Sequence, residues 1–289
     1  MIGKIIKSQK ELYFVDTNDS VYMAKARGNF RVKDKKPLVG DNVEIEVLED
    51  SKAYITRLLP RKNEIKRPNI ANIDQLLVFV TINDPPLNLY NLDKYLAMCE
   101  YLNISATIML TKIDLASDEK IAKLEDVYKN IGYEVILIDN YKDFPKEKIG
   151  EILKGKTSAV SGASGVGKST FLSNLIDEEI EIGSISQKSK RGKNTTRHTE
   201  IFKLGEDTFI FDTPGFDSFD LDFLEDENDL KNTFVEFRDR TCKFKDCNHI
   251  NEPSCRVKED LEDRKISKSR YKNYIQLFEE LKQRRLNKW

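Results

Sequence analysis

The first 62 residues consist largely of short stretches in which apolar and polar positions alternate. Such stretches occur at residues 2–6, 12–15, 21–24, 43–47 and 54–58, and turn-forming pairs such as Asn18-Asp19 and Gly40-Asp41 lie between them. Alternation with a period of two predicts strands that bury one face. Five short strands predict a small closed barrel, and the OB-fold, a five-stranded barrel that commonly binds oligonucleotides, is the leading choice.

The pattern changes after the barrel. Residues 65–72 are polar and contain Pro68, so we assign them to a linker that follows a barrel domain of residues 1–64. Nearly continuous apolar runs at 75–81, 107–110 and 135–138 then alternate with helical patterns at 92–102 and 121–131. This alternation predicts an α/β domain with a doubly wound, mostly parallel sheet, which we place at residues 73–220.

A third region, residues 221–289, is expected to be helical. Residues 259–285 carry an apolar stripe of Ile275, Phe278 and Leu281 at helical spacing. The positions around this stripe are strongly basic, and we expect all of the following at the surface: Arg264, Lys265, Lys268, Arg270, Lys272, Arg284 and Arg285.

A phosphate-binding loop lies between a strand-like run at 157–160 and a helix-like run at 170–176. Residues 162–169 read Gly-Ala-Ser-Gly-Val-Gly-Lys-Ser, the G-x-x-x-x-G-K-S pattern. Its glycines let backbone N–H groups cradle phosphate oxygens, and the helix N-terminus adds a positive dipole end. We expect Lys168 to reach the β- and γ-phosphates and Ser169 to bind magnesium. The expected contacts from this region are Gly162, Ala163, Ser164, Gly165, Val166, Gly167, Lys168, Ser169 and Thr170.

Two further elements identify the nucleotide as GTP. Downstream, a strand at 209–211 leads into a D-x-x-G element that begins at Asp212 and ends at Gly215, the residues expected near magnesium and the γ-phosphate. Upstream, a strand leads into Thr111-Lys112-Ile113-Asp114, a T/N-K-x-D element. A carboxylate at Asp114 can accept hydrogen bonds from the guanine N1–H and 2-amino group, donors that adenine does not present there.

The polar, basic stretch 183–200 resembles a nucleotide-sensing switch. It contains Thr195 and Thr196, and we choose Thr196 as the second magnesium ligand because P-loop GTPases use such a threonine to sense the γ-phosphate.

Three of the four cysteines lie within 14 residues, together with one of the two histidines. The spacing Cys242-x4-Cys247-x-His249-x5-Cys255 supplies four ligands in one short loop. Zinc prefers such Cys₃His sets, and four protein ligands leave no open position, so we expect one structural zinc ion. Cys99, on a predicted helix, is expected to be a small buried hydrophobe.

Charge is unevenly distributed along the chain. Residues 1–71 carry 15 basic and 10 acidic side chains, residues 72–230 carry 17 and 29, and residues 231–289 carry 16 and 10. Two basic flanks suggest a polyanionic partner such as RNA, although ordinary solvated surface is the alternative. The basic segment 25–36 includes Phe30, and an RNA-contacting loop and a solvated loop are equally consistent with it.

The chain has no apolar run long enough for a membrane helix, and its N-terminus lacks the apolar core of a signal peptide. We therefore expect a soluble, cytoplasmic protein with no membrane partner. No coiled-coil pattern is present, so a monomer is expected.

The order of the nucleotide-binding elements is unusual, because the guanine-reading element precedes the phosphate loop. In this order, and in its flanking domains, the chain resembles the circularly permuted GTPases that act in small ribosomal subunit biogenesis, the RsgA type. The resemblance implies an N-terminal OB domain, a permuted GTPase domain and a C-terminal zinc domain. It further implies GTP hydrolysis with Mg²⁺ that is stimulated by the small ribosomal subunit, and contacts between both basic flanks and ribosomal RNA.

The sequence departs from this family at two places. The family switch usually reads His-Thr-Thr, but position 194 is Asn, so His198 is the substitute candidate for positioning the attacking water. The loop that touches the guanine carbonyl should lie near Asp139-Asn140 and is not matched. The expected catalytic set is therefore Lys168, Thr196, Gly215 and His198. A non-catalytic RNA-binding factor that uses GTP only as a conformational ligand is the alternative, whereas Asp114 argues against an ATP-using enzyme.

Overall fold

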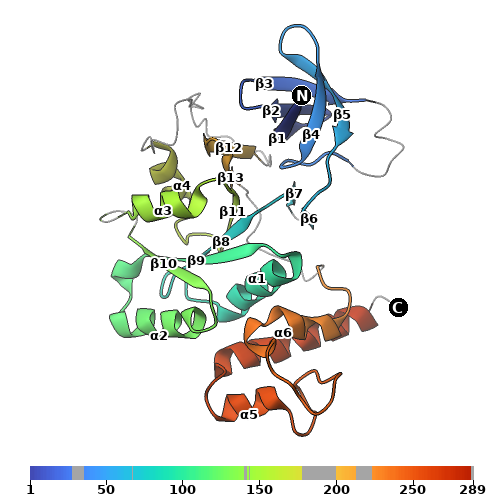
Figure 1. The fold of residues 1–289 in the computed structure, drawn as a ribbon. Helices are drawn as coiled ribbons and strands as arrows, with labels where there is room; N and C mark the ends of the chain where they lie inside the picture. The colour runs from blue at the N-terminus through green and yellow to red at the C-terminus, as the bar shows by residue number, and fades with distance from the viewer. Residues whose placement is uncertain are drawn as a thin grey trace.

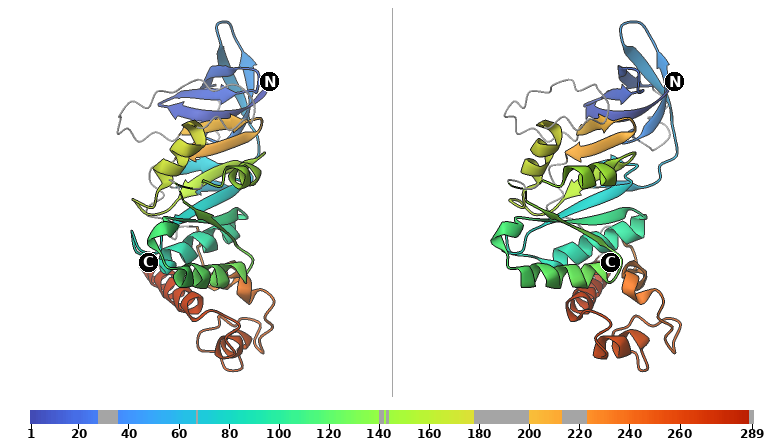
Figure 2. Two further views of the ribbon diagram at one scale, coloured as in Figure 1. Left: turned by 90° about the vertical axis from the view of Figure 1, so that its left-hand side faces the viewer. Right: turned by 60° about the vertical axis from the view of Figure 1, so that its left-hand side comes forward.

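The protein consists of a small barrel, a central sheet covered by helices, and a C-terminal helical module. The computed structural model describes residues 1–27, 36–66, 68–139, 142, 144–177, 200–212 and 223–287. The three parts follow one another along the long axis of the molecule (Figures 1 and 2). This architecture confirms the predicted fold class.

The N-terminal barrel contains five strands: β1 (Ile2–Gln9), β2 (Leu12–Asp16), β3 (Val21–Ala26), β4 (Asn42–Val47) and β5 (Lys52–Leu58). They pair in the order β1-β2-β3-β5-β4, and β4 pairs with β1 to close the barrel. The alternating apolar positions point inward. They form a core of Ile5, Tyr13, Val15, Ala24, Val43, Ile45, Ala53 and Ile55. Each of the five predicted strands is present.

The stretch predicted as a linker contains structure of its own. Strands β6 (Glu64–Lys66) and β7 (Asn69–Ala71) form a two-stranded antiparallel hairpin. Ile65 and Ile70 of this hairpin are buried in the same core as the central sheet. The connection between the barrel and the central domain is therefore packed rather than extended.

The central sheet has the strand order β10-β9-β8-β11-β13-β12. Its strands are β8 (Gln75–Val80), β9 (Ser105–Thr111), β10 (Glu134–Ile138), β11 (Thr157–Ser161), β12 (Glu200–Gly205) and β13 (Thr208–Asp212). All neighbouring pairs are parallel except β12–β13. The sheet is therefore the mostly parallel one that the buried strand pattern predicts.

Helices cover both faces of this sheet. On one face, α1 (Leu89–Leu102) and α2 (Asp118–Lys129) pack through residues such as Leu96 and Leu124. On the other, α3 (Lys146–Leu153) and α4 (Lys168–Asp177) pack through residues such as Ile149 and Leu172. The sequence analysis did not predict α3, because a helix of eight residues shows too few turns for its period to stand out.

The C-terminal module consists of two 3₁₀ segments, η3 (Glu227–Thr233) and η4 (Val235–Phe237), followed by α5 (Arg256–Glu262) and α6 (Lys268–Leu286). The single helical region predicted at 259–285 is divided, because Arg264 adopts a left-handed conformation with φ +61°. The Asp260 carbonyl accepts hydrogen bonds from the N–H groups of Lys265 and Ile266 and closes this turn.

Two details of the predicted α6 surface are wrong. Arg270 was expected at the basic surface, yet it is 1% exposed and lies between α6 and the central domain. Phe278 and Leu281 of the predicted apolar stripe are buried as expected, but Ile275 is only half-buried. Tyr274 and Leu277, which were not in the stripe, are fully buried. The face of α6 that packs inward is rotated relative to the prediction, and it includes a charged side chain. Among the residues that the structure describes, no helix combines the length and the apolarity that a membrane crossing requires.

Candidate nucleotide site and zinc centre

The parallel strands of the central sheet bring the predicted nucleotide-binding elements to one edge. Thr111 is the last residue of β9 and residues 112–114 follow it, the phosphate loop follows β11, and Asp212 is the last residue of β13. β8 lies between β9 and β11, and β11 is adjacent to β13. Since the carboxyl ends of parallel strands lie at the same edge, elements separated by about 100 residues of sequence form one site.

Glycine is required in the phosphate loop for two physical reasons. Gly162, Gly165 and Gly167 have φ values of +134°, +82° and +93°, which other residues rarely adopt. A Cβ atom on Gly162 would lie 2.3 Å from the Phe79 carbonyl oxygen of β8. The loop can therefore pack against β8 and turn its N–H groups toward a ligand only with glycine at these positions.

The phosphate loop leads directly into α4, which begins at Lys168. The Ser169 side chain is exposed in the first turn, where free N–H groups favour an anion. The Lys168 ammonium donates to the carbonyl oxygens of Gly162 and, at 2.9 Å, Ala163. Lys168 thus lies folded over its own loop, and its Nζ can exchange these carbonyls for phosphate oxygens.

The guanine-reading element is attached to the phosphate loop. The buried Thr111 hydroxyl donates to the Val166 carbonyl oxygen at 2.5 Å. Lys112 has a left-handed backbone conformation with φ +53°, and after it Ile113–Leu115 forms a single 3₁₀ turn that leaves the Asp114 side chain exposed. Thr111 therefore braces the two loops against each other, whereas Asp114 is free to contact a base.

Sequence reasoning missed a third loop at this edge, the one that follows β8. The Asp84 carboxylate lies 3.2 Å from the Lys112 ammonium, and the Asn83 amide donates to the Leu115 carbonyl. Pro85 of the same loop follows a cis peptide bond and lies 3.9 Å from the position of a Cβ on Gly165. This loop contacts both the guanine-reading element and the phosphate loop. Its only sequence signal is the Asn-Asp-Pro-Pro turn pattern.

A small cavity of about 50 Å³ lies behind the phosphate loop. Gly162, Ala163 and Val166 form one wall, and Asn91, Leu92 and Tyr95 of the first turns of α1 form another. The first turn of α1 begins at Asn88, whose side chain accepts from the Asn91 N–H at 3.0 Å. The phosphate loop and the N-terminal half of α1 therefore border the same cavity.

Several predicted residues lie outside the described part of the chain. These are Asn140, Asn194, Thr195, Thr196, His198 and Gly215, together with most of the basic segment 25–36. The proposed roles of Thr196, His198 and Gly215 therefore stay predictions.

The three clustered cysteines and His249 meet as the spacing predicts. Their ligand atoms all lie within 4.8 Å of one another. The His249 Nδ1 is 3.5 Å from Cys242 Sγ and 3.4 Å from Cys255 Sγ, and these two sulfurs are 3.9 Å apart. A tetrahedral zinc ion requires separations of about 3.8 Å between sulfurs and about 3.6 Å between sulfur and nitrogen, given its usual bond lengths. The donor set therefore fits zinc in both chemistry and spacing.

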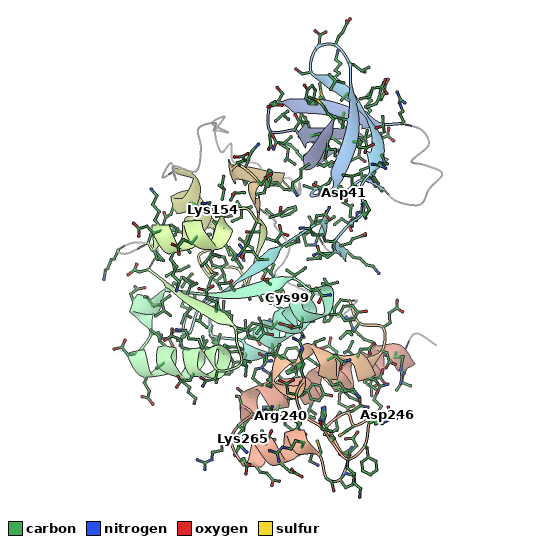
Figure 3. The ribbon with its side chains drawn as sticks, viewed as in Figure 1. Asp41, Cys99, Lys154, Arg240, Asp246 and Lys265 are labelled. Atoms are coloured by element: carbon green, nitrogen blue, oxygen red, sulfur yellow. The ribbon has the colours of Figure 1, made fainter. Side chains whose placement is uncertain are left out.

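Burial determines the protonation of the residues in this cluster. Burial raises the pKa of Cys247 to about 12 and also raises that of Cys255, so these thiols stay protonated unless a cation replaces the protons. Burial lowers the pKa of His249 and keeps its imidazole neutral, the form that binds metal. Cys99 lies on α1 (Figure 3), is not a member of this cluster, and is fully buried as predicted.

Glu252, which the sequence did not single out, organises the zinc loop. Its carboxylate accepts hydrogen bonds from the N–H groups of Asn248 at 2.8 Å, Ile250 at 2.9 Å and Asn251 at 3.1 Å. Although burial acts in the opposite direction, these bonds lower its pKa. Two tyrosines of α6 also hold the loop, since Tyr271 donates to the His249 carbonyl and Tyr274 to the Asn248 carbonyl, both at 2.6 Å. The zinc loop is thereby fastened to α6.

Comparison with known proteins yields one family over the whole chain. Residues 58–222 match the model described as RsgA GTPase, and residues 2–55 match the one described as RsgA N-terminal domain. A protein of Alkaliphilus metalliredigens named small ribosomal subunit biogenesis GTPase RsgA is 40% identical over 288 residues, covering 98% of each chain. One of the same name from Clostridium beijerinckii is 40% identical over 292 residues and covers both chains completely.

Solved structures agree with these relatives. The crystal structure of YjeQ from Thermotoga maritima matches with a TM-score of 0.84 at 32% identity, covering 97% of this chain and 98% of that one. The crystal structure of YloQ, a circularly permuted GTPase, matches with a TM-score of 0.81 at 33% identity, covering 98% and 95%. With a phosphate loop that follows its guanine-reading element, a barrel before them and a Cys₃His module after them, this chain belongs to the RsgA family of circularly permuted GTPases.

Proposed function

We propose that this protein binds and hydrolyses GTP and assists the biogenesis of the small ribosomal subunit. The observation that carries the proposal is the meeting of the phosphate loop and the guanine-reading element at one sheet edge, where the Thr111 hydroxyl fastens them together. The relatives that match nearly the full chain are named small ribosomal subunit biogenesis GTPases. The geometry of the site and the names of the relatives both support GTP as the nucleotide, and the names of the relatives support a role in ribosome biogenesis.

Each residue of the site has a proposed role in this reaction. The N–H groups of residues 162–170 hold the phosphates, and Lys168 neutralises charge on the β- and γ-phosphates. Ser169 and Thr196 would hold Mg²⁺, which would supply positive charge that stabilises the phosphates during hydrolysis. Asp114 accepts the guanine donors, and Asp84 orients the Lys112 ammonium beside them. Thr196, Gly215 and His198 remain the proposed groups around the γ-phosphate and the attacking water.

The zinc site has a structural role in this proposal. One zinc ion held by Cys242, Cys247, His249 and Cys255 has no open coordination position, so it stabilises the loop rather than acting on GTP. The basic N-terminal and C-terminal regions supply the RNA-facing surfaces of a factor that binds the small subunit as a monomer.

The direct test measures GTP turnover with and without purified small ribosomal subunits. We expect slow hydrolysis by the protein alone and faster hydrolysis with the subunit. Lys168→Ala is the control and should lose both activities. If GTP is bound but never hydrolysed in either condition, the protein is the non-catalytic, GTP-sensing factor.

Base selectivity provides a second test. Asp114→Asn should shift preference from GTP toward xanthosine triphosphate by about 10-fold or more, because hydrogen bonds to a charged group are each worth roughly 1.5–3 kcal/mol. Competition binding with the two nucleotides measures the shift. Asp118→Asn, another exposed carboxylate close by, is the matched control and should leave selectivity unchanged. An Asp114→Asn protein that still prefers GTP as strongly as the wild type would show that another group reads the base.

A further inference from the structure

A fully buried charged cluster joins the C-terminal module to the central domain. The Arg270 guanidinium of α6 donates to both carboxylate oxygens of Glu236, each at 2.8 Å, and to Asp93 of α1 at 2.7 Å. The Arg270 and Asp93 side chains are 1% and 0% exposed. Within this cluster one guanidinium therefore bridges the 3₁₀ segment of the C-terminal module and a helix of the GTPase domain.

The rest of the cluster satisfies the remaining polar atoms. Asp93 also accepts from the Tyr128 hydroxyl of α2 at 2.8 Å and from the Asn273 amide of α6 at 2.6 Å. The guanidinium carbon lies 4.6 Å from the centre of the Phe234 ring. Burying one cation with two carboxylates is costly, and a hydrophobic contact of the same size often stabilises as well. What the charged cluster adds is a defined orientation between α1 and α6.

Two sets of side chains on helix α1 face different parts of the molecule. Leu92 and Tyr95 line the cavity behind the phosphate loop, while Tyr90, Asp93 and Ala97 lie against the C-terminal module. These two sets alternate along the same turns of the helix. A shift of the phosphate loop that moves the first turns of α1 must therefore also move Asp93, because a helix of this length behaves as a rigid unit.

We propose that α1 is a connector between the nucleotide site and the zinc-bearing module, and that Arg270 is the positioning residue that fixes the module to it. The phosphate loop acts on one face of α1, and Arg270 with Glu236 holds the other. Binding at either end then changes the other end through the same contact. The part of this inference that concerns ribosomal subunits rests on the proposed function, whereas the connection itself does not.

The first experiment needs only the protein and GDP. Amide hydrogen exchange is followed along the chain by mass spectrometry, with and without saturating GDP. In the wild type we expect GDP to slow exchange in the phosphate loop, in α1 and, by about 5-fold or more, in α6. The absence of any slowing in α6 would overturn the proposal.

The decisive variant removes the charges together, so that no charge is left buried without a partner. In the combination Asp93→Asn, Glu236→Gln and Arg270→Met, GDP should still slow exchange in the phosphate loop and the first turn of α1, but not in α6. Arg270→Lys keeps the positive charge without the two-oxygen contact and should restore part of the effect. Arg238→Ala, which removes an exposed ion pair with Glu100 at the same interface, is the matched control and should behave as wild type. If GDP slows amide exchange in α6 of the triple variant as much as in the wild type, the charged cluster does not have the proposed role.

A second experiment adds small ribosomal subunits. The triple variant should keep basal GTP turnover within about twofold of the wild type, yet lose about 5-fold or more of the stimulated rate, with a smaller change in subunit affinity. A purely structural role would lower the basal and stimulated rates together. If the subunit does not stimulate even the wild type, the proposed function fails, and the exchange experiment alone decides the role of the connector.

Discussion

The two junctions on either side of the central domain are built in different ways. At the barrel, backbone continues from one domain into the next, because β1 pairs with the edge strand β12 at Lys7 and Glu200 and the sheets merge. Within residues 223–287 the C-terminal module shares no strand with the central sheet, and its contacts with α1 are made by side chains, including those around Arg270. The first junction depends on the path of the main chain, and the second on the identity of a few residues.

The barrel junction shows this dependence on the main chain at Gly40. The Gly40 N–H donates to the Ile5 carbonyl at 2.8 Å, and a Cβ at this position would lie 2.1 Å from the Ala71 carbonyl oxygen. Asp41, next to it, is buried and paired with Arg61 at 2.6 Å, and it lies where the barrel meets the central domain (Figure 3). Side chains assist here, but the close approach of two backbones sets the geometry.

Loss of the zinc ion should reduce stability the most, because the zinc site holds together the loop of the C-terminal module that packs on α6. Cys247→Ser should lower zinc from one ion per chain and unfold residues 242–255, since a structural zinc site contributes about 10 kcal/mol or more of apparent binding energy. Metal analysis and circular dichroism measure both effects. Cys99→Ala should keep the full zinc content, because Cys99 is not a ligand. A Cys247→Ser protein with one tightly bound zinc would contradict the assigned ligand set.

Arg270→Ala should be the most damaging single change at the side-chain junction. It leaves Asp93 and Glu236 buried without their cation, which typically costs about 3–5 kcal/mol. Urea unfolding monitored at the C-terminal module should detect this loss. The triple variant Asp93→Asn, Glu236→Gln and Arg270→Met should regain much of the lost free energy of unfolding. If it does not, packing rather than charge holds the junction.

Gly40→Ala should be the most damaging change at the backbone junction. Gly40 has φ +95°, and the added methyl group would meet backbone that cannot move aside, so we expect a loss of about 1–3 kcal/mol. Thermal unfolding and limited proteolysis between barrel and central domain are suitable measurements. Gly132→Ala offers a control, because Gly132 has a similar φ of +96° with no atom within 4 Å. Equal losses in the two variants would show that conformational strain, not the approach of the two domains, is responsible.

Lys203→Ala should have the smallest effect of the four. The Lys203 ammonium of β12 lies 2.8 Å from Asp16 of the barrel and 5.9 Å from the centre of the Phe209 ring. Because the lysine side chain is 29% exposed, we expect a loss of about 1 kcal/mol or less that shrinks at high salt. Unfolding at two salt concentrations measures it. A loss as large as that of Arg270→Ala would erase the distinction between the two junctions.

Patterns within short segments allowed most elements and ligands to be predicted. The strand alternation of the barrel, the glycine spacing of the phosphate loop and the cysteine spacing of the zinc loop each concern neighbouring residues, and the structure places all three as expected. The α6 prediction failed at Arg270, because helical periodicity alone cannot distinguish an exposed arginine from one that is buried with carboxylates from another domain. The brace made by Thr111 was missed for the same reason, since its partner, Val166, lies on a different loop.

The sequence by itself determined which local structures form and which chemical groups are available, because backbone propensity, side-chain period and ligand type act over a few residues. Only the tertiary structure decided how these parts are joined. Asp93 and Arg270 are 177 residues apart, and Asp16 and Lys203 are 187 apart. Such contacts depend on which surfaces the folded domains present to each other, and the energy of a buried charge depends on every partner that surrounds it. No pattern within a single segment contains that information.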